Sequence, residues 1–179
     1  MDFDLSSEQK LLRDSIVRFA RGELNQEVVE RDRAQSFRRD LWRHCAAVGL
    51  DPLSCAGALE ALGYGCRDGG LVFSICAHVL ACVVPVWQHG SEAQKQRYLR
   101  GLCDGTLVGA HAITEPDSGS DTFAMRLRAE RAGDGWRLNG SKTFISNGPV
   151  ADVVVVFAVT DPAKGFHGGV TAFLVDRGL

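Results

Sequence analysis

The chain has 179 residues, of which 45% are hydrophobic and 23% are charged, and its formal net charge is −2 at pH 7. This blend supports a packed core and excludes a disordered chain. Acidic residues are interleaved with the basic ones, as in ERDRAQSFRRD, so no basic stripe is offered to nucleic acid. The opening MDFDLSSEQK is acidic and polar, which is not the pattern of a secretory signal, and we expect a cytoplasmic location.

Residues 1–104 are predicted to form an N-terminal all-α domain of five helices. In the first helix, apolar residues such as Leu12 and Ile16 recur at steps of three and four, which is the spacing of one helix face. Ser6 followed by Gln9 has the S-x-x-Q pattern of a capping box. The sequence therefore predicts an amphipathic helix that begins just after Ser6.

The next two helices are expected over 37–48 and 56–64. Ser36 is the candidate cap of the former helix, and Gly49 is expected to end it. The side chains that this helix is expected to bury are Leu41, Trp42 and Cys45.

The fourth helix is expected to begin near Gly70 and is apolar almost all round, as is typical of a helix buried among its neighbours. Pro85 is expected to end or kink it. The longest apolar run, ACVVPVW, is far too short to span a bilayer, so we expect no membrane span. A fifth helix follows Ser91, with Gln94 at the capping-box position.

Six cysteines are present, and no two of them form a C-x-x-C pair. Most lie within helical patterns beside apolar residues, so we interpret them as reduced, buried thiols. Cys76 with His78 is the nearest approach to metal-ligand spacing. Core packing is the favoured interpretation of that pair, and no metal site is predicted.

Residues 105–179 are predicted to form a middle β domain, because the apolar period changes from helical to extended. Short segments rich in β-branched and aromatic residues are separated by turn signals such as GDG and NGP. In MRLRAER the alternation sets Met125, Leu127 and Ala129 on one face, which predicts a strand with one wet side. The fold class is therefore α+β, with a helical domain followed by an antiparallel β domain.

The stretch TEPDSGSD follows the apolar segment LVGAHAI and is expected to form a bend. Pro116 and Gly119 impose the turn, while Thr114 and Ser120 present hydroxyls. Such a loop suits an anion or the polar rim of a cofactor. From this segment alone, a capped surface turn is the favoured alternative. A serine hydrolase and a P-loop are disfavoured, because neither G-x-S-x-G nor G-x-x-x-x-G-K-[ST] occurs.

Phe144 and Ser146 lie two residues apart in WRLNGSKTFISNG and would therefore share one face of a predicted strand. A flat heteroaromatic ring lying over that strand would use the apolar surface of one and the hydrogen bond of the other. The alternative is that Phe144 is a core aromatic and Ser146 ends the strand, which is the commoner situation for a lone aromatic residue.

Taken in this order and at this spacing, the segments resemble the acyl-CoA dehydrogenase family of flavoproteins. The resemblance covers nearly the whole chain and is carried by LSSEQKLLRDSIVRFA, HGSEAQKQRYLRGLCDGTLVGAHAITEPDSGSD, GDGWRLNGSKTFISNGPVADVVVVFA and GGVTAFLV. It implies FAD as the cofactor and α,β-dehydrogenation of an acyl thioester, in which a carboxylate removes the α proton while hydride leaves the β carbon for the flavin. Fatty acid or polyketide metabolism, an electron-transfer acceptor and an oligomeric assembly are implied in the same way.

The resemblance also assigns roles to residues of the first segment. It implies that His111, Ile113 and Thr114 run beside the flavin, with the last two at its pyrimidine end. Gly119 and Ser120 would lie at the pyrophosphate. Ser120 would also contact the thioester arm of the substrate.

In the second segment, the resemblance implies that Phe144 covers the isoalloxazine and that the hydroxyl of Ser146 approaches the reactive flavin nitrogen. The family's catalytic base comes from a C-terminal helical domain, and this chain stops inside the β domain, which is therefore incomplete. No catalytic residue is expected in this chain. Glu115 belongs to the TEP motif, and a structural role is expected for it. The link between AAVGLDP and EALGYG is also shorter than in the family.

Two hypotheses for the function remain open. The first is that the chain is the N-terminal portion of an acyl-thioester dehydrogenase that binds FAD together with a complementary C-terminal portion, on the same polypeptide or a separate one. The second is a non-catalytic binding or assembly subunit that keeps the fold. The sequence does not separate coenzyme A thioesters from acyl groups on a carrier protein, and it does not define the acyl chain.

Overall fold

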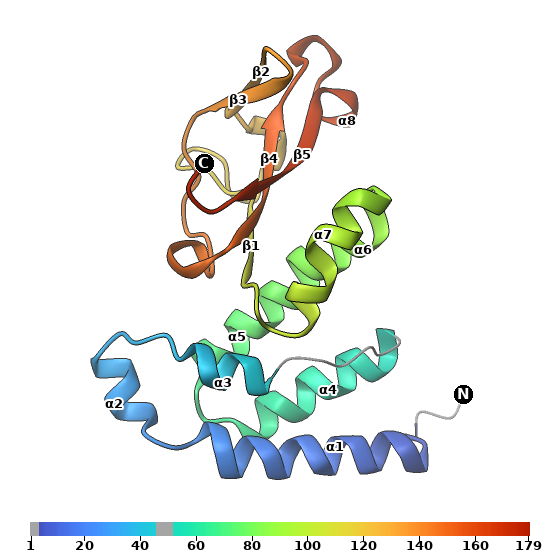
Figure 1. Ribbon diagram of the computed structural model, residues 1–179, viewed down its shortest axis with the longest axis vertical. Coiled ribbons are helices and arrows are strands. Elements are labelled where there is room, and N and C mark those ends of the chain that lie inside the picture. Colours follow the sequence, from blue (N-terminus) through green and yellow to red (C-terminus); the bar gives the residue numbers. More distant parts are fainter. Residues whose placement is uncertain (1–3, 46–51) are drawn as a thin grey trace.

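The computed structural model describes residues 4–45 and 52–179. Most of the helices lie in the lower and middle parts of Figure 1, and a five-stranded sheet, with one short helix beside it, lies in the upper part. The helices are α1 (Ser7–Phe19), α2 (Val28–Arg33), α3 (Arg39–His44), α4 (Pro52–Gly65), α5 (Gly69–His78), α6 (Val84–His89), α7 (Glu92–Cys103) and α8 (Phe166–Gly169). The strands are β1 (Gly109–Ala112), β2 (Arg128–Ala132), β3 (Gly135–Asn139), β4 (Val153–Val159) and β5 (Val170–Asp176). This arrangement confirms the α+β class.

Two helices begin with the capping boxes that the sequence predicts. The Ser6 hydroxyl accepts the backbone N–H of Gln9, and the Gln9 side chain accepts the N–H of Ser6. Ser91 and Gln94 form the same reciprocal pair at the start of α7. Each box satisfies two N–H groups that have no partner within the helix.

The second predicted helix, α3, has a different start from the one expected. Arg38 is at its N-cap, and Ser36 does not cap it. The N–H of Ser36 instead donates to the carbonyl of Arg31 at 3.1 Å, at the end of α2. The sequence did not predict α2, and Ser36 is used to end that helix rather than to begin the next one.

The core beneath the helices contains Leu41 and Trp42, as predicted, together with Ala20, Leu24 and Leu62. Cys45 is partly buried and packs against the same cluster. Gly49 falls within 46–51, outside the described residues. The shortened link, residues 53–59, lies inside α4.

α5, a π-helical turn (Val79–Val83) and α6 form one continuous helix, so Pro85 does not end it. Pro85 lies in the first turn of α6 but inside the continuous helix, where it has no N–H to donate to the preceding turn. The helix, Gly69–His89, is long and apolar enough to cross a membrane by length and composition, so the shortness of ACVVPVW was not a sound reason to exclude a span. Only 22% of the most apolar 18-residue stretch of this helix is buried among the described residues. The prediction of a helix enclosed by its neighbours is therefore wrong for this part of the chain.

The sheet is mixed, and the prediction of an antiparallel domain is wrong in this respect. β4 pairs in parallel with β1 and β2 and antiparallel with β5, and β2 and β3 form an antiparallel hairpin. β1 and β4 lie side by side although the chain makes the whole β2–β3 hairpin between them. Such a long crossover connection permits parallel pairing but leaves no local turn signal. The side chains of Met125, Leu127 and Ala129 are buried, as predicted.

Two aspartates fasten the helical half to the sheet. Asp152 Oδ2 is 2.9 Å from Arg39 Nη1 of α3 and accepts the N–H of Val108 at 2.8 Å. Asp176, at the end of β5, accepts the hydroxyl of Tyr98 from α7 at 2.9 Å. These contacts set the sheet against α3 and α7.

Candidate functional site

The two segments that the sequence singled out lie in contact. The backbone N–H of Thr143 donates to the carbonyl of Thr114 at 3.0 Å, so the bend after β1 lies against the loop between β3 and β4. Within the bend, Glu115 and Ser118 exchange backbone hydrogen bonds of 2.9 and 3.2 Å around Pro116. The fold therefore joins the two segments into one surface.

Buried charges hold this contact in place. Lys142 Nζ lies 2.8 Å from Glu115 Oε1 and 3.0 Å from the carbonyl oxygen of Ile113. Glu115 also accepts the N–H groups of Arg126 and Leu127 at 2.7 and 2.9 Å. Burial acts to raise the pKa of Glu115, but these donors outweigh it and the pKa is lowered. An ionised carboxylate with both oxygens engaged is not free to act as a base, which agrees with the structural role predicted for it.

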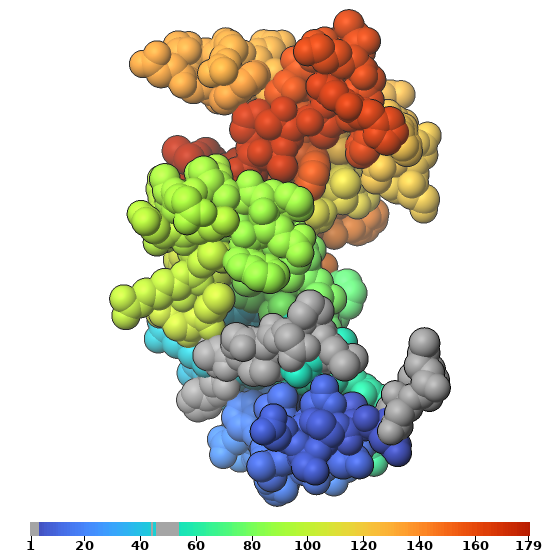
Figure 2. Space-filling model, turned by 90° about the vertical axis from the view of Figure 1, so that its right-hand side faces the viewer, coloured from blue at the N-terminus to red at the C-terminus, as the bar shows by residue number. Residues whose placement is uncertain are grey.

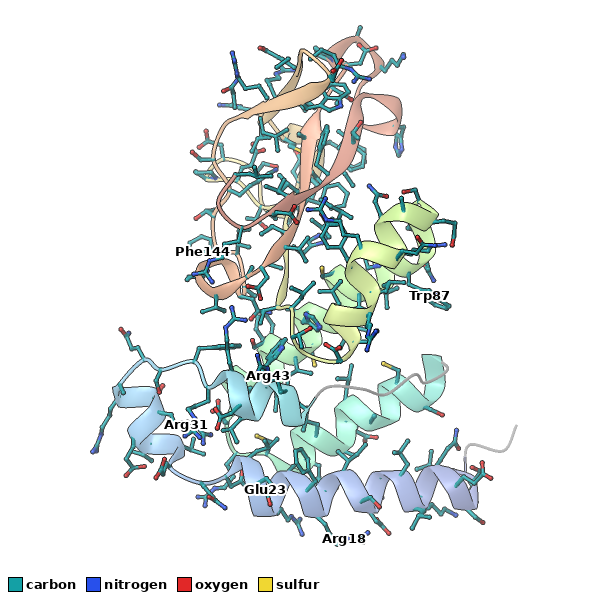
Figure 3. The ribbon with its side chains drawn as sticks, in the orientation of Figure 1. Arg18, Glu23, Arg31, Arg43, Trp87 and Phe144 are labelled. Atoms are coloured by element: carbon teal, nitrogen blue, oxygen red, sulfur yellow. The ribbon has the colours of Figure 1, made fainter. Side chains whose placement is uncertain are left out.

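Phe144 and Ser146 do not lie on a strand, which corrects the prediction. β3 ends at Asn139, and Phe144 has a φ of +54°, in the left-handed region that strand residues rarely adopt. Phe144 is 92% exposed, so the alternative of a core aromatic is also wrong. Figure 3 shows it at the outer edge of the loop. Its ring is a flat apolar surface that no neighbour covers among the described residues.

Three of the predicted site residues carry hydroxyls that are available for a ligand. Among the residues that the structure describes, the side chains of Thr114, Ser120 and Ser146 make no hydrogen bond. Ser118 differs, because its hydroxyl donates to the carbonyl of Asp121 at 2.7 Å. Gly119 is exposed, and a Cβ built on it would meet nothing within 4 Å. The backbone at the tip of the bend is therefore open to a close approach.

His111 turns toward the helices. Its Nδ1 lies 2.8 Å from the carbonyl oxygen of Ala81, and since a carbonyl only accepts, Nδ1 carries the hydrogen. Ala81 lies four residues before Pro85, which has no N–H to offer that carbonyl. The ring also packs against Phe157 at a centroid distance of 5.1 Å. The histidine thus secures β1 against the π-helical turn.

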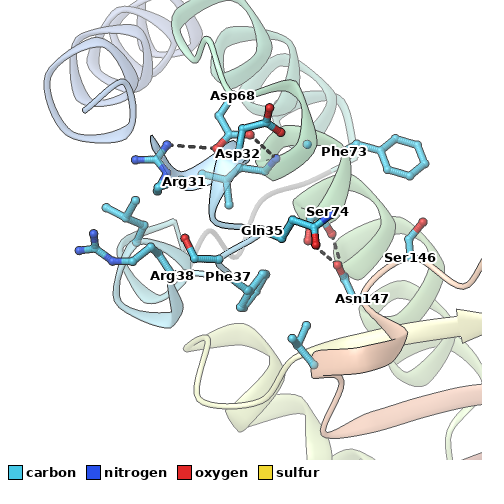
Figure 4. Close-up of a pocket in the computed structure, with 15 residues that line it drawn as sticks. Arg31, Asp32, Gln35, Phe37, Arg38, Asp68, Phe73, Ser74, Ser146 and Asn147 are labelled. Carbon is cyan, nitrogen blue, oxygen red and sulfur yellow. Dashed lines mark hydrogen bonds and ion pairs between the residues drawn. The ribbon is translucent and has the colours of Figure 1, made fainter. Parts of the chain in front are cut away.

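A cavity of about 450 Å³ opens beside Ser146, between α2, α3, α5 and the turn at 146–150 (Figure 4). Its size lies within the range of small-molecule sites. Its apolar lining consists of Phe37, Leu41, Leu71, Phe73 and Val150. Its polar lining includes Ser74, Asn147 and the Arg31–Asp68 ion pair, whose atoms are 3.1 Å apart.

Asn147 connects the turn to the helix that lines the cavity. Its Nδ2 donates to the carbonyls of Ser74 and Gly109 at 3.0 and 3.1 Å, and the Ser74 hydroxyl donates to its Oδ1. Sequence reasoning missed Asn147, Ser74 and Lys142. The Asn-Gly pair signalled only a turn, and nothing local marks a lysine or serine that bonds to a distant segment.

Cys76 and His78 do not form a metal site. His78 Nδ1 accepts the N–H of Gly109 at 2.8 Å, and its Nε2 lies 3.0 Å from the carbonyl of Leu102, to which it donates. In the described part of the chain, no group of three or more His, Cys, Asp or Glu side chains is placed to hold a metal ion. The cysteines are free thiols, but Cys103 is exposed, so the expectation that all are buried is wrong.

Family models match both halves of the chain. The model described as acyl-CoA dehydrogenase, middle domain, matches residues 110–179. The model described as acyl-CoA dehydrogenase, N-terminal domain, matches residues 6–51 and 46–106.

Curated relatives align over almost the whole chain. An L-prolyl-[peptidyl-carrier protein] dehydrogenase from Serratia sp. is 42% identical over 192 residues, which cover 99% of this chain and 50% of the relative. A short-chain-specific acyl-CoA dehydrogenase from Clostridium acetobutylicum is 36% identical over 193 residues, covering 100% of this chain and 50% of the relative. The chain spans about half the length of these relatives.

Solved structures share the same half-fold. A structure described as PigA with FAD and proline superposes with a TM-score of 0.92 at 41% identity, covering 99% of this chain and 50% of PigA. Butyryl-CoA dehydrogenase from Megasphaera elsdenii superposes with a TM-score of 0.88 at 36% identity, covering 99% of this chain and 50% of that enzyme. The matches to both family models and to these relatives lead to one conclusion: the chain belongs to the acyl-CoA dehydrogenase family.

Proposed function

We propose that the chain forms part of the site of an FAD-dependent dehydrogenase that oxidises the Cα–Cβ bond of an acyl thioester. The bend at 113–120 and the loop at 142–146 together form the surface that holds the flavin, here called the flavin bed. The hydrogen bond from Thr143 to Thr114 carries this proposal, because it unites two loops that bear free hydroxyls and an exposed aromatic ring. An isoalloxazine requires hydrogen bonds along its edge and apolar contact on its face. The residues present offer both, so they fit FAD.

The chain's own residues bind and orient the cofactor in this proposal. When bound, FAD supplies the redox chemistry by accepting two electrons from the substrate. Thr114 serves the pyrimidine end, and the open backbone at Gly119 and Ser120 serves the pyrophosphate. Phe144 covers the ring, and Ser146 presents its hydroxyl at the reacting edge. His111 acts indirectly, because it anchors the strand that leads into the bend.

The cavity beside Ser146 is proposed to receive the acyl group. Its volume of about 450 Å³ suits a short acyl chain rather than a long one. Its polar lining, including the Arg31–Asp68 pair, also admits an acyl group with a polar substituent. The Serratia relative is named for a prolyl group on a carrier protein and the Clostridium relative for short-chain acyl-CoA. We favour the carrier-bound thioester, with coenzyme A as the alternative.

A second half of the fold is proposed to complete the site and supply the base. The helix Gly69–His89 supports this, because it exposes Phe73, Leu80 and Trp87 at 64%, 55% and 56%, spaced at intervals of seven residues. Large apolar side chains repeated along one helix indicate a surface that another protein element covers. Figure 2 shows this region, in green, on the surface between the sheet and the amino-terminal helices.

The proposal extends to the electron acceptor, the location and the assembly of the complete enzyme. The complete enzyme would pass its electrons to an electron-transfer protein, work in the cytoplasm as an oligomer without spanning a membrane, and serve fatty acid or polyketide metabolism. A non-catalytic assembly subunit is the second candidate. It is favoured by one observation, the engagement of both Glu115 oxygens, which removes a carboxylate near the bed from proton chemistry.

The visible absorption spectrum is the first test. The chain is co-expressed with the second half of the Serratia relative, and flavin absorption with reduction by a prolyl-carrier or short-chain acyl thioester is the expected result. Flavin without reduction by any thioester would favour the assembly subunit. Failure to retain flavin in the co-purified complex would contradict the flavin bed itself.

A further inference from the structure

We propose that Asn147 is a positioning residue that fixes Ser146 at the junction of the flavin bed and the acyl cavity. This inference rests on the proposed function. Asn147 does not touch the bed through its own side chain, because that side chain points to α5 and β1. It acts on the neighbouring serine through the backbone.

The amide of Asn147 uses its full set of donors. Its two N–H bonds go to the carbonyls of Ser74 and Gly109, which are 73 and 38 residues away in sequence. Its oxygen accepts the hydroxyl of Ser74. Three hydrogen bonds to α5 and β1 hold this side chain in one orientation, and they restrict the backbone of Asn147 as well.

Backbone hydrogen bonds restrain the chain on both sides of Ser146. On one side, the N–H of Gly148 donates to the carbonyl of Ile145 at 3.0 Å, which closes a turn around it. On the other, the N–H of Thr143 is bonded to the bend after β1. The Ser146 hydroxyl itself makes no hydrogen bond among the described residues. Its direction therefore depends on the backbone that Asn147 secures.

The left-handed backbone of Asn147 does not by itself explain why its side chain bonds to Ser74 and Gly109. Its φ is +66°, a left-handed conformation that asparagine tolerates in ordinary turns. A turn asparagine usually bonds to its own neighbours. Here the amide reaches α5 and the start of β1 instead, which is the arrangement expected of a tie between the turn and the walls of the site.

The tie also connects the cavity to the flavin bed. Ser74 lines the cavity and bonds twice to Asn147, and Ser146 lines both the cavity and the bed. A displacement of α5 by an acyl group would therefore reach Ser146 through one side chain. Positional errors of this kind are costly, since a shift of about 1 Å at a reacting group lowers rates by about 100-fold.

The decisive variant is Asn147→Gly, because glycine adopts the positive φ without strain and only the side chain is lost. In the isolated chain, exchange of the hydrogen-bonded amides of Thr143 and Gly148 is expected to accelerate at least about tenfold relative to the unmodified chain. The matched control is Asn139→Gly, at the exposed end of β3, which should leave exchange of these two amides unchanged. Unchanged exchange in Asn147→Gly would overturn the inference, whether or not the chain binds FAD.

The flavin-loaded complex with the second half gives the second readout. Asn147→Gly is expected to shift the flavin absorption band and to slow reduction by about 10- to 100-fold, with FAD affinity within about threefold. Ser74→Ala should produce part of the same effect, and the double variant should add little to Asn147→Gly. Full additivity, or a spectrum and rate equal to those of the unmodified complex, would contradict the coupling. Absence of flavin from the unmodified complex would refute the proposed function alone.

Discussion

Lys142 Nζ and Glu115 Oε1 lie 2.8 Å apart, and both side chains are almost completely buried. The pair joins the bend after β1 to the loop that carries Phe144 and Ser146. It belongs to no single secondary-structure element, and its partners are backbone groups at the ends of strands. It holds the two halves of the candidate flavin bed in one fixed relation.

Replacement of Lys142 should destabilise the protein strongly. Lys142→Met leaves a buried carboxylate without its cation, and breaking a buried pair in this way costs about 3–5 kcal/mol. The free energy of unfolding, measured by urea denaturation, checks this. Lys164→Met is the matched control, since the exposed Lys164–Asp161 pair should contribute less than about 1 kcal/mol. Similar losses in the two variants would contradict the importance of burial.

Gly109→Ala should also destabilise, because the start of β1 lies directly on the helix. An added Cβ would come within 2.5 Å of Cys82 Sγ and 3.1 Å of His78 Nδ1. Overpacking of this kind costs about 1–3 kcal/mol. Gly57→Ala, in α4 with nothing within 4 Å of the new Cβ, should instead stabilise by up to about 1 kcal/mol. Chemical denaturation of both variants gives the comparison.

Stability should fall with acidification because of His78. Burial lowers the pKa of this histidine, although its hydrogen bond to the Leu102 carbonyl opposes the shift. With a lower pKa in the folded than in the unfolded state, the unfolded chain binds more protons below about pH 6.5, so stability drops from there toward the folded pKa. Urea denaturation between pH 7.5 and 5.5 measures this slope. The slope should shrink in His78→Gln, and an unchanged slope would assign it to other groups.

Thiol reactivity should separate the cysteines. Burial raises the pKa of Cys45 and of Cys82 to about 12, and it also raises the pKa of Cys103, but among these three only Cys103 is exposed to reagent. Since the thiolate is the reactive form, an aromatic disulfide reagent at pH 8 should modify Cys103 first and Cys82 only after unfolding. Spectrophotometric titration follows both phases. Loss of the fast phase in Cys103→Ser is expected, and its persistence would contradict this order.

The features that the sequence predicted well are those with local causes. The pairs Ser6–Gln9 and Ser91–Gln94 were found because a capping box is read within four residues. Ser36 shows the limit of this rule, since a serine near a helix start also serves to end the preceding helix. Local patterns state what a residue is able to do, and the tertiary structure decides which use is made of it.

The features that were missed depend on long-range pairing. The parallel contact of β1 with β4 and the bonds of Asn147 to Ser74 join residues that no local pattern relates. The composition of WRLNGSKTFIS, rich in β-branched and aromatic residues, predicts a strand that includes Phe144, yet Phe144 adopts a left-handed φ after β3 has ended. The roles of Thr114, Gly119, Ser120, Phe144 and Ser146 toward FAD remain predictions.

The apolar surface of the helix Gly69–His89 has a practical consequence for the life of the chain in a cell. A long hydrophobic helix face in contact with water attracts chaperones and other unfolded chains. The cellular amount of this chain would then depend on the protein element that covers the helix face. Synthesis of that element would control how much of the chain escapes degradation.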